Sequence, residues 1–322
     1  MRNSILLFTL AALPVASTQA ADLFVSSVGG GSTCTVEQPC SSLQAAIDLA
    51  MASDRIYVKA GSYAENITIP AGKDGLSILG DGAKRTQLVS DGGDSPVKYA
   101  PAGVPADIIV DIFSPNVTIE GFTIRHPEGV PTKRDIAVFV RPPALNASIE
   151  HNSIERLRTG TVLEPTAPGS RGLLVVQATG AEISKNRLSG NYQDQIHLPT
   201  SAAEVMGNQI TGATRFGIVI IQETPDTLSR DNIIANNSVT ASGRDGIQIQ
   251  GDANSISRNK VTGNAGAGIR LCGPTSVPEC AAPGTTATAS DNIVTRNKNL
   301  KGNVEGAVLD YGVDNIIQQP GR

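Results

Sequence analysis

Residues 234–249 read IANNSVTASGRDGIQI, and variants of this stretch recur through the chain. The first half places Asn237 between two aliphatic residues, and the second half is the comb Gly246-Ile-Gln-Ile. The asparagines equivalent to Asn237 are Asn152, Asn186, Asn208, Asn259 and Asn297. From Asn186 onward they are 22, 29, 22 and 38 residues apart, and a comb begins nine residues after each of them. The combs begin at Gln195, Gly217, Gly246, Gly268 and Gly306.

A repeat of about 22 residues with short alternating strands predicts a solenoid. One turn of chain cannot bury its own apolar face, but parallel turns stacked on one another bury a continuous column. We expect the asparagines to stack as a ladder of side-chain amides at a sharp corner. The glycine would permit the tight turn before the next strand. Residues are added between a comb and the next Asn, so insertions leave from one corner of the unit.

The composition suits such a stack. The chain has 322 residues, only 11 of them aromatic (Phe 6, Tyr 5), and a formal net charge of −4. Few aromatic residues favour thin layers of Ile, Val and Leu over a core of large rings. The mildly acidic balance offers no electrostatic footprint for a nucleic acid.

The Asn and Gly pattern resembles the right-handed parallel β-helix proteins of the pectin-lyase-like superfamily. The resemblance implies an all-β fold, a single-stranded right-handed parallel β-helix of about ten rungs. At ~4.8 Å per rung the rod would be about 50 Å long. Such families close one end with an amphipathic helix, and Ser41–Ala50, within a capping segment 34–52, has that pattern. The first rungs would be Arg55–Val58, Ile67–Ile69 and Leu76–Ile78.

The two ends of the pattern predict an exported protein. Residues 1–20 resemble a secretory signal peptide cleaved after Ala20, and no later apolar run is long enough to span a membrane. The β-helix domain would then cover 21–322. Insertions are expected at 159–170, 222–231 and 272–290. An even number of cysteines in an exported chain predicts two short disulfides, Cys34–Cys40 and Cys272–Cys280. We therefore expect a secreted or periplasmic monomer.

Polar residues of successive combs should share one outward strip. Positions +1 and +3 of each comb are apolar and should face inward, so position +2 faces outward. Residues two and one places before each comb would lie on the same strip. The strip contains the candidate catalytic residues His197, Arg215 and Arg244, and the candidate substrate-binding residues Gln193, Asp194, Asp245, Gln248 and Arg270.

This strip suits an acidic polysaccharide, because the planar guanidinium matches a carboxylate. A uronate lyase or epimerase needs a base to remove the proton beside a neutralised carboxylate. His197 would be that base, and Arg215 and Arg244 the neutralising groups. A non-catalytic module for glycan binding or surface attachment is the alternative. The same residues could also be solvated charges on a sheet face. Asp194 and Asp245, about 9.6 Å apart, would suit an inverting hydrolase, but caps on backbone amides are the favoured interpretation.

Other sequence motifs bear on esterase activity and on metal or cofactor sites. Gly61–Ile67 with Leu79–Gly82 resembles the N-terminal part of pectin methylesterases, but the motifs QDTL and DF[IV]FG are absent, so esterase activity is not expected. No cofactor or metal site is evident. Ca²⁺ could bind among Asp231, Asp245, Asp252 and Asp291, but no spaced calcium loop appears. His126 and His151 stand alone, and His151 should lie at a turn. The expected partner is a polysaccharide or cell-surface glycan.

Overall fold

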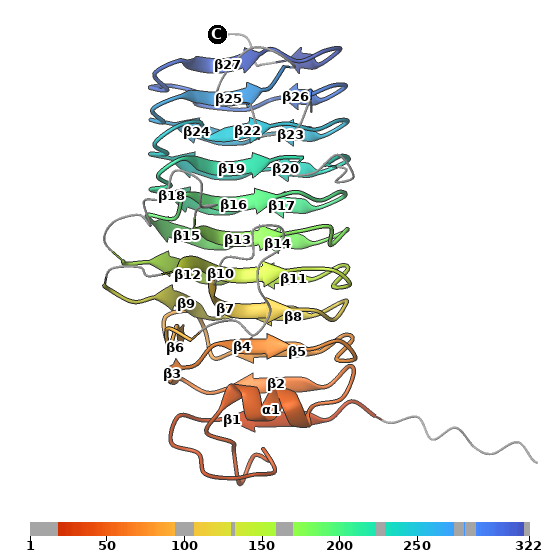
Figure 1. Cartoon of the computed structure of the whole chain (residues 1–322), viewed down its shortest axis with the longest axis vertical. Helices are drawn as coiled ribbons and strands as arrows, with labels where there is room; N and C mark the ends of the chain where they lie inside the picture. Colours follow the sequence, from red (N-terminus) through yellow and green to blue (C-terminus); the bar gives the residue numbers. More distant parts are fainter. Residues whose placement is uncertain are drawn as a thin grey trace, which may run out of the picture.

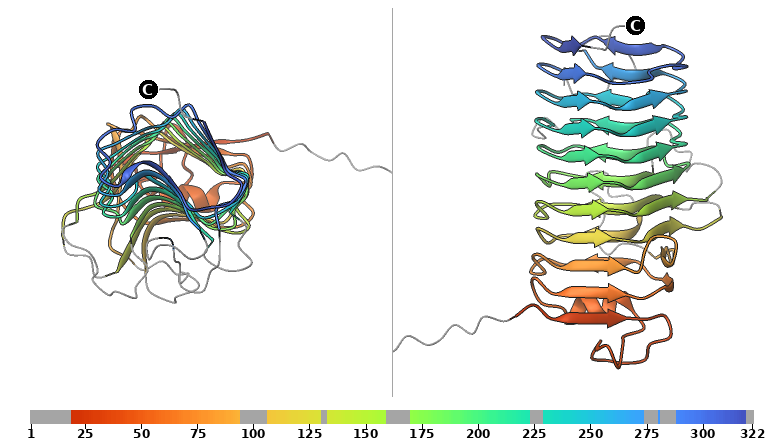
Figure 2. Two further views of the ribbon diagram at one scale, coloured as in Figure 1. Left: turned by 90° about the horizontal axis from the view of Figure 1, so that it is seen from above. Right: turned by 180° about the vertical axis from the view of Figure 1, so that it is seen from behind.

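The chain folds into a solenoid of three parallel β-sheets, which we call A, B and C (Figure 1). The computed structural model describes residues 19–93, 106–129, 133–158, 170–222, 229–273, 280 and 288–318. Within these ranges sheet A has 11 strands, sheet C nine and sheet B eight. Seen along its axis, the coil superimposes one turn on the next (Figure 2). The parallel β-helix and its stacked rungs are thus confirmed.

From β2 to β25 each turn of the coil contributes one strand to each sheet, in the order A, B, C. The strands of sheet A are β1 (Asp22–Val25), β2 (Arg55–Val58), β5 (Ser77–Gly80), β8 (Thr118–Glu120), β11 (Ser148–Glu150), β14 (Glu182–Ser184), β17 (Glu204–Met206), β20 (Ile233–Ala235), β23 (Ser255–Ser257), β26 (Ile293–Thr295) and β28 (Ile316–Gln318). Those of sheet B are β3 (Gly61–Ala64), β6 (Thr86–Val89), β9 (Thr123–His126), β12 (Ser153–Arg156), β15 (Arg187–Gly190), β18 (Gln209–Thr211), β21 (Ser238–Thr240) and β24 (Lys260–Thr262). Those of sheet C are β4 (Ile67–Ile69), β7 (Ala106–Ile112), β10 (Arg134–Val140), β13 (Arg171–Val175), β16 (Asp194–Leu198), β19 (Phe216–Ile220), β22 (Ile247–Ile249), β25 (Ala267–Leu271) and β27 (Gly306–Asp310).

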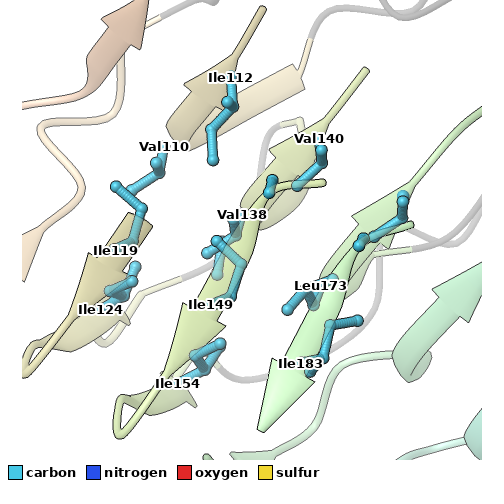
Figure 3. Packing of buried hydrophobic residues seen from close by; sticks show 14 of the residues in the cluster. Val110, Ile112, Ile119, Ile124, Val138, Val140, Ile149, Ile154, Leu173 and Ile183 are labelled. Carbon is cyan, nitrogen blue, oxygen red and sulfur yellow. The ribbon is translucent and has the colours of Figure 1, made fainter. Parts of the chain in front are cut away.

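Aliphatic side chains form columns that run along the inside of the solenoid (Figure 3). In sheet A, Ile119 pairs with Ile149, which pairs with Ile183, and all three are buried. In sheet B, Ile154 pairs with Ile124 on one side and with Leu188 on the other in the same way. Because side chains alternate between the two faces, this in-register stacking fixes which residues face outward on every rung.

The predicted asparagine ladder runs along the corner between sheets A and B. The backbone N–H of Asn186 donates to Asn208 Oδ1 at 2.9 Å, and that of Asn208 donates to Asn237 Oδ1 at 2.9 Å. The Asn208 side-chain amide also donates to the Ile183 carbonyl at 2.9 Å. Each asparagine therefore supplies hydrogen bonds to buried backbone groups at a corner where regular pairing stops.

Two further ladders were not predicted. One runs along the corner between sheets C and A, and the other along the corner between sheets B and C, where Asn264 accepts from the Ser242 N–H at 2.9 Å. The members of the first are Asn232, Asn254, Asn292 and Asn315. The first three lie five residues before Asn237, Asn259 and Asn297, so the sequence held a signal for them.

The comb glycines have a different role from the one expected. Gly217, Gly246 and Gly268 do not have a positive φ, so none is there to make a left-handed turn. A Cβ on Gly217 would lie 2.3 Å from Val239 Cγ1, and one on Gly246 would lie 2.3 Å from Val261 Cγ1. For these three glycines the turn explanation was wrong, whereas Gly306, which begins the last comb, does have a positive φ of 131°. The comb requires glycine because the next rung packs too closely to leave room for a side chain.

The last comb is shifted by one residue. Gly306 pairs with Ala267, so Val308 lies opposite the inward-facing Ile269 and packs against the core. Leu309 takes the outward position opposite Arg270. The nine-residue spacing therefore predicts the wrong face for this rung, since a slip of one residue exchanges the two faces of a strand.

The first rungs also differ from the prediction. β2 and β5 are neighbours in sheet A, whereas β4 belongs to sheet C. Arg55–Val58 and Ile67–Ile69 are therefore two sides of one turn, and sheet A begins earlier, at β1.

A short helix, α1 (Leu43–Leu49), lies at the N-terminal end of the solenoid within the predicted capping segment (Figure 1). Ser42 is its N-cap and accepts from the Ala45 N–H at 3.2 Å. Glu65 accepts from the Leu43 N–H at 2.7 Å and so ties the helix to the first full turn. The predicted signal peptide and most of each predicted insertion fall outside the described residues.

Candidate functional site

The outward column of sheet C passes through the predicted strip. In register it contains Asp111, Phe139, Leu174, His197, Val219, Gln248, Arg270 and Leu309. These side chains point away from the main core, as predicted, but those from Asp111 to Arg270 are buried. His197 is only 1% exposed. The period-two alternation of the sequence predicts which face of the strand these residues occupy, but it does not predict whether other segments cover that face.

One part of the strip is a cluster around Asp194. Asp194 Oδ2 lies 3.2 Å from Arg171 Nε and 2.8 Å from His197 Nδ1. The other carboxylate oxygen, Oδ1, accepts from Arg215 Nε at 3.2 Å. Arg171 also donates to Gln193 Oε1 at 2.9 Å. The structure thus brings three side chains onto one buried carboxylate: the sequence-predicted His197 and Arg215, and Arg171.

Charge decides the protonation state of this cluster. Burial by itself would raise the pKa of Asp194, but Arg171, Arg215 and His197 hold it well below the usual range for an aspartate. Burial lowers the pKa of the Arg215 guanidinium, Asp194 raises it, and the positive charges of Arg171 and Arg244 lower it further. Asp194 is therefore a permanent anion at neutral pH, and Arg215 lies within the field of two other arginines.

Arg215 and Arg244 stand one above the other at the edge of sheet C. The Arg215 N–H donates to the Gln193 carbonyl at 2.9 Å, and the Arg244 N–H donates to the Arg215 carbonyl at 2.8 Å. The Arg215 side chain is 28% exposed, and Arg244 is exposed. Arg244 forms no ion pair with another residue in the described ranges. Accessible positive charge on the strip is concentrated on these two residues.

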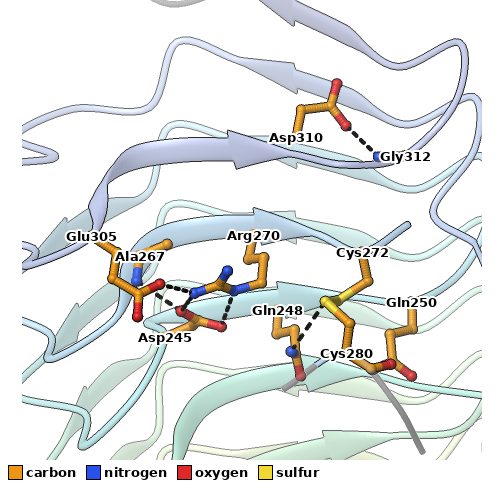
Figure 4. Close-up of a disulfide and its surroundings, with 10 residues drawn as sticks. All are labelled: Asp245, Gln248, Gln250, Ala267, Arg270, Cys272, Cys280, Glu305, Asp310 and Gly312. Atoms are coloured by element: carbon orange, nitrogen blue, oxygen red, sulfur yellow. Dashed lines mark hydrogen bonds and ion pairs between the residues drawn. A yellow bond between two sulfur atoms is a disulfide. The ribbon is translucent and has the colours of Figure 1, made fainter. Parts of the chain in front are cut away.

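The second part of the strip is centred on Asp245. Its carboxylate accepts from Arg270 Nε at 2.7 Å and from the Ala267 N–H at 2.7 Å, and Glu305 also contacts the guanidinium (Figure 4). Burial would lower the pKa of Arg270, but its bonds to Asp245 and Glu305 raise it overall. Asp245 thus caps a backbone amide, as favoured from the sequence, and its pairing with Arg270 leaves neither group presented as a ligand for substrate.

An apolar cluster separates these two parts. Phe216, Val219 and Ile221 are buried together on the outer face of sheet C. Gln248 lies beyond them, where its side-chain amide approaches Cys280 Sγ at 3.9 Å (Figure 4). The predicted strip is therefore two separate ionic clusters, and Gln248 and Arg270 are buried.

Both predicted disulfides are present, Cys34–Cys40 and Cys272–Cys280. The second lies on the outer face of sheet C, since Gln250 donates to the Cys280 carbonyl at 2.6 Å. The Ala289 N–H donates to the Cys272 carbonyl at 2.8 Å, which closes the stem of this insertion where it leaves the rung. Ser229 closes the preceding insertion in the same way, by donating to the Ile221 carbonyl at 2.6 Å.

His126 is not alone, contrary to the sequence prediction. It is fully buried, with Nδ1 2.9 Å from the Tyr192 hydroxyl and Nε2 3.1 Å from the Asp107 carbonyl oxygen. Asp107 and Asp135 carboxylate oxygens lie 3.8 and 3.9 Å from Nε2. Burial lowers the pKa of His126 although both carboxylates oppose this shift. Asp107 and Asp135 occur in similar strands 28 residues apart, DIIV and DIAV, and this was the missed signal.

The Asp107, His126 and Asp135 ligand atoms lie within 4.8 Å of one another, close enough for a metal ion. The carboxylates are already engaged, however. Arg158 donates to Asp135 at 2.8 Å and to Asp107 at 2.6 Å, and Arg156 donates to Asp135 at 2.7 Å. The positive charges of Arg156 and Arg158 balance the negative charges of Asp107 and Asp135, so these residues do not favour binding of a metal cation.

The remaining predicted residues occupy separate places. Asp231 pairs with Arg230, and Asp252 accepts from Ser290 Oγ at 2.8 Å. The four aspartates considered for Ca²⁺ do not belong to the group of described residues that could hold a metal ion. His151 lies at a turn with φ 55°, as expected, and is 3.4 Å from both Glu120 and Glu150.

A membrane-crossing helix, long and apolar enough to span a bilayer, is not found among the described residues.

Comparisons with known proteins agree with the architecture. A family described as right handed beta helix region matches residues 115–278 and 171–319, which together are more than half of the chain. The solved Dettilon tailspike protein is 19% identical, with a TM-score of 0.62 over 85% of this chain, which spans 50% of the tailspike. A solved rhamnogalacturonan lyase is 13% identical, with a TM-score of 0.54 over 86% of this chain and 82% of that one. No curated protein matches the chain.

Proposed function

Since the chain belongs to the right-handed β-helix family, we propose that it is an exported protein that binds an acidic polysaccharide at the edge of sheet C. The two disulfides support export, because such bonds persist in oxidising compartments. The observation that carries the proposal is a group of three arginines: Arg171 and Arg215 pair with the Asp194 carboxylate, and Arg244 lies close enough to Arg215 for its charge to lower the Arg215 pKa.

The accessible members of this group are suited to carboxylates of a sugar polymer. Arg215 and Arg244 come from adjacent rungs, so their backbone positions are about 4.8 Å apart along the solenoid axis. The planar fork of each can form paired hydrogen bonds with a carboxylate. Gln193 lies next in the same column and offers an amide to sugar hydroxyls. Asp194 holds Arg215 in place without neutralising Arg244.

A uronate lyase or epimerase is the second candidate. His197 Nδ1 lies 2.8 Å from Asp194, an arrangement in which a carboxylate orients an imidazole for proton transfer. The likeness in fold to a rhamnogalacturonan lyase is compatible with this chemistry. The burial of His197 favours binding over catalysis, since a base must reach the proton that it removes.

Binding can be tested with the double variant R215Q/R244Q. We expect its Kd for polygalacturonate oligosaccharides to rise at least about tenfold, because two charge-assisted contacts are lost. The matched control is R55Q/R85Q, which removes two exposed arginines in surface ion pairs far from sheet C. Equal affinity in the wild type and R215Q/R244Q, with the fold intact, would refute the proposed site.

Catalysis can be tested separately with H197A on a panel of uronate polymers. Lyase activity would appear as growth of the absorbance of unsaturated uronates in the wild type and its loss in H197A. Epimerase activity would appear as deuterium uptake from solvent. Binding without either signal in the wild type would leave the non-catalytic module as the function.

A further inference from the structure

A line of exposed cations follows the asparagine ladder on the corner between sheets A and B, the one corner in which sheet C takes no part. Three of the ladder asparagines are flanked on both sides by basic residues: Lys185-Asn-Arg187, Arg258-Asn-Lys260 and Arg296-Asn-Lys298. The asparagines are buried and the six basic residues are exposed. We call these six residues the corner ridge.

The geometry of the corner keeps these side chains outside the solenoid. The residues before the asparagines, Lys185, Arg258 and Arg296, all have a left-handed backbone, with φ between 55° and 57°. Arg187 and Lys260 begin strands β15 and β24 of sheet B, and Lys298 forms an isolated bridge directly opposite Lys260. Because the ladder asparagine points inward, its two neighbours on the tight corner point outward. Repetition of the rung therefore repeats the charges along a line.

The ridge is not paired with acids. None of its six members forms an ion pair with another residue of the described ranges. The outward residues of β23, β24 and β26 are serine, threonine, isoleucine and lysine, whereas Glu150 of β11 lies opposite Ser184, beside the Lys185 end of the ridge. This is a concentration of positive charge in a chain whose formal net charge is −4.

Stacking like charges costs stability. Lysines directly opposite each other on neighbouring parallel strands repel, and exposed charges gain nothing from the fold in return. A linear polyanion laid along the corner would offset this repulsion at every charged rung. The rungs between the charged ones present Gln209, Asn236 and Ser238, whose amides and hydroxyl can bond to sugar hydroxyl groups.

We propose that the corner ridge is a second binding site, distinct from the edge of sheet C, for a linear acidic polysaccharide that carries carboxylate or sulfate groups. A nucleic acid fits the ridge less well. Single strands bind through stacking on aromatic side chains, and the ridge and the outward faces of β18, β21 and β24 contain none. The inference stands independently of the sheet C proposal, because it uses different residues on a different corner.

The test uses the quadruple variant R258Q/K260Q/R296Q/K298Q of the full chain. Binding is measured to polygalacturonate, to dextran sulfate and to neutral dextran at several salt concentrations. We expect the wild type to bind one or both polyanions with an affinity that falls as salt rises, and the variant to lose at least about tenfold. The two polyanions distinguish carboxylate from sulfate as the recognised group. The charge-matched control for the double variant K260Q/K298Q is R55Q/R230Q, which removes two exposed arginines outside this corner and should lose less than about twofold.

Three results would overturn the proposal. The first is an unchanged affinity of the quadruple variant, and the second is an equal loss in the control. The third is duplex or single-stranded DNA binding as tightly as the polysaccharides at the same salt. The double variant K260Q/K298Q guards against misfolding, since both positions are extended and exposed, and it should retain the wild-type Tm while losing part of the affinity. The first result, combined with loss of binding in R215Q/R244Q, would place the bound polyanion at the edge of sheet C instead.

Discussion

The corner between sheets A and B and the outer face of sheet C follow opposite rules. At the corner the same residue, asparagine, occupies the same place from Asn152 to Asn297 and makes the same bonds on each rung. On sheet C the register-equivalent residues are acidic, aromatic, aliphatic, amide and basic in turn. Repetition at the corner specifies the scaffold, whereas the lack of repetition on sheet C marks where individual side chains have individual partners.

The sharpest way to break this contrast is Asn237→Ala. The change removes the acceptor of the Asn208 N–H and the donor to the Val205 carbonyl, both buried at the corner. Leaving two such groups unsatisfied should lower the free energy of unfolding by about 4 kcal/mol. Urea unfolding followed by circular dichroism measures it. The exposed neighbour variant Asn236→Gly should cost far less, and equal effects would show that the ladder amide is unimportant.

Asp194→Asn tests the sheet C side of the comparison. The variant leaves Arg171 and His197 beside a neutral group, so we expect a loss of about 3 kcal/mol at pH 7. Because the folded-state pKa of Asp194 is depressed, its contribution is fully present above the ordinary aspartate pKa of 3.8, declines below that value, and disappears only as the pH falls through the folded-state pKa. The difference in unfolding free energy between wild type and variant should therefore stay constant from pH 7 to about pH 4 and narrow below it. A difference that does not narrow between about pH 4 and pH 2.5 would contradict the charge assignment.

Gly246→Ala examines the close approach between rungs. A methyl group 2.3 Å from Val261 Cγ1 must displace a packed side chain, which should cost about 2 kcal/mol. The double variant with Val261→Ala should recover only part of the loss, since it removes the nearest atom but leaves the Gly268 carbonyl oxygen 2.9 Å from the added methyl group. If the single variant is as stable as the wild type in thermal melts, packing does not explain the comb glycine.

The smallest expected effect concerns His126. Its pKa is lowered in the folded state, so the unfolded chain takes up a proton below about pH 6.5 that the folded chain refuses, and stability falls with the pH. Between pH 7.5 and 5.5 this linkage is worth up to about 1.4 kcal/mol. His126→Gln should flatten that part of the stability profile, and replacement of the exposed His151 by Gln should leave it intact. An unchanged slope in His126→Gln would refute the linkage.

The contrast between the repeating corner and the non-repeating face of sheet C also explains which features could be predicted from the sequence. Period-two alternation and the recurring Asn were sufficient for the solenoid, the corner ladder and the outward direction of His197 and Arg270. The role of Gly246 was misread because a spacing does not reveal how closely the neighbouring rung packs. The burial of His197 and the convergence of His126 with Asp107 and Asp135 depend on contacts between distant segments, and no local pattern reports those.

The closed stems of the two insertions on sheet C have a practical consequence. Each insertion returns to the rung close to where it left it. This return is fixed by the hydrogen bond from Ser229 to Ile221 in one insertion and by that from Ala289 to Cys272 in the other. The asparagine at the next corner therefore keeps its place whether 22 or 38 residues separate it from the last one. New segments of chain could be spliced in at these two exits, and the coil beneath them would need no redesign.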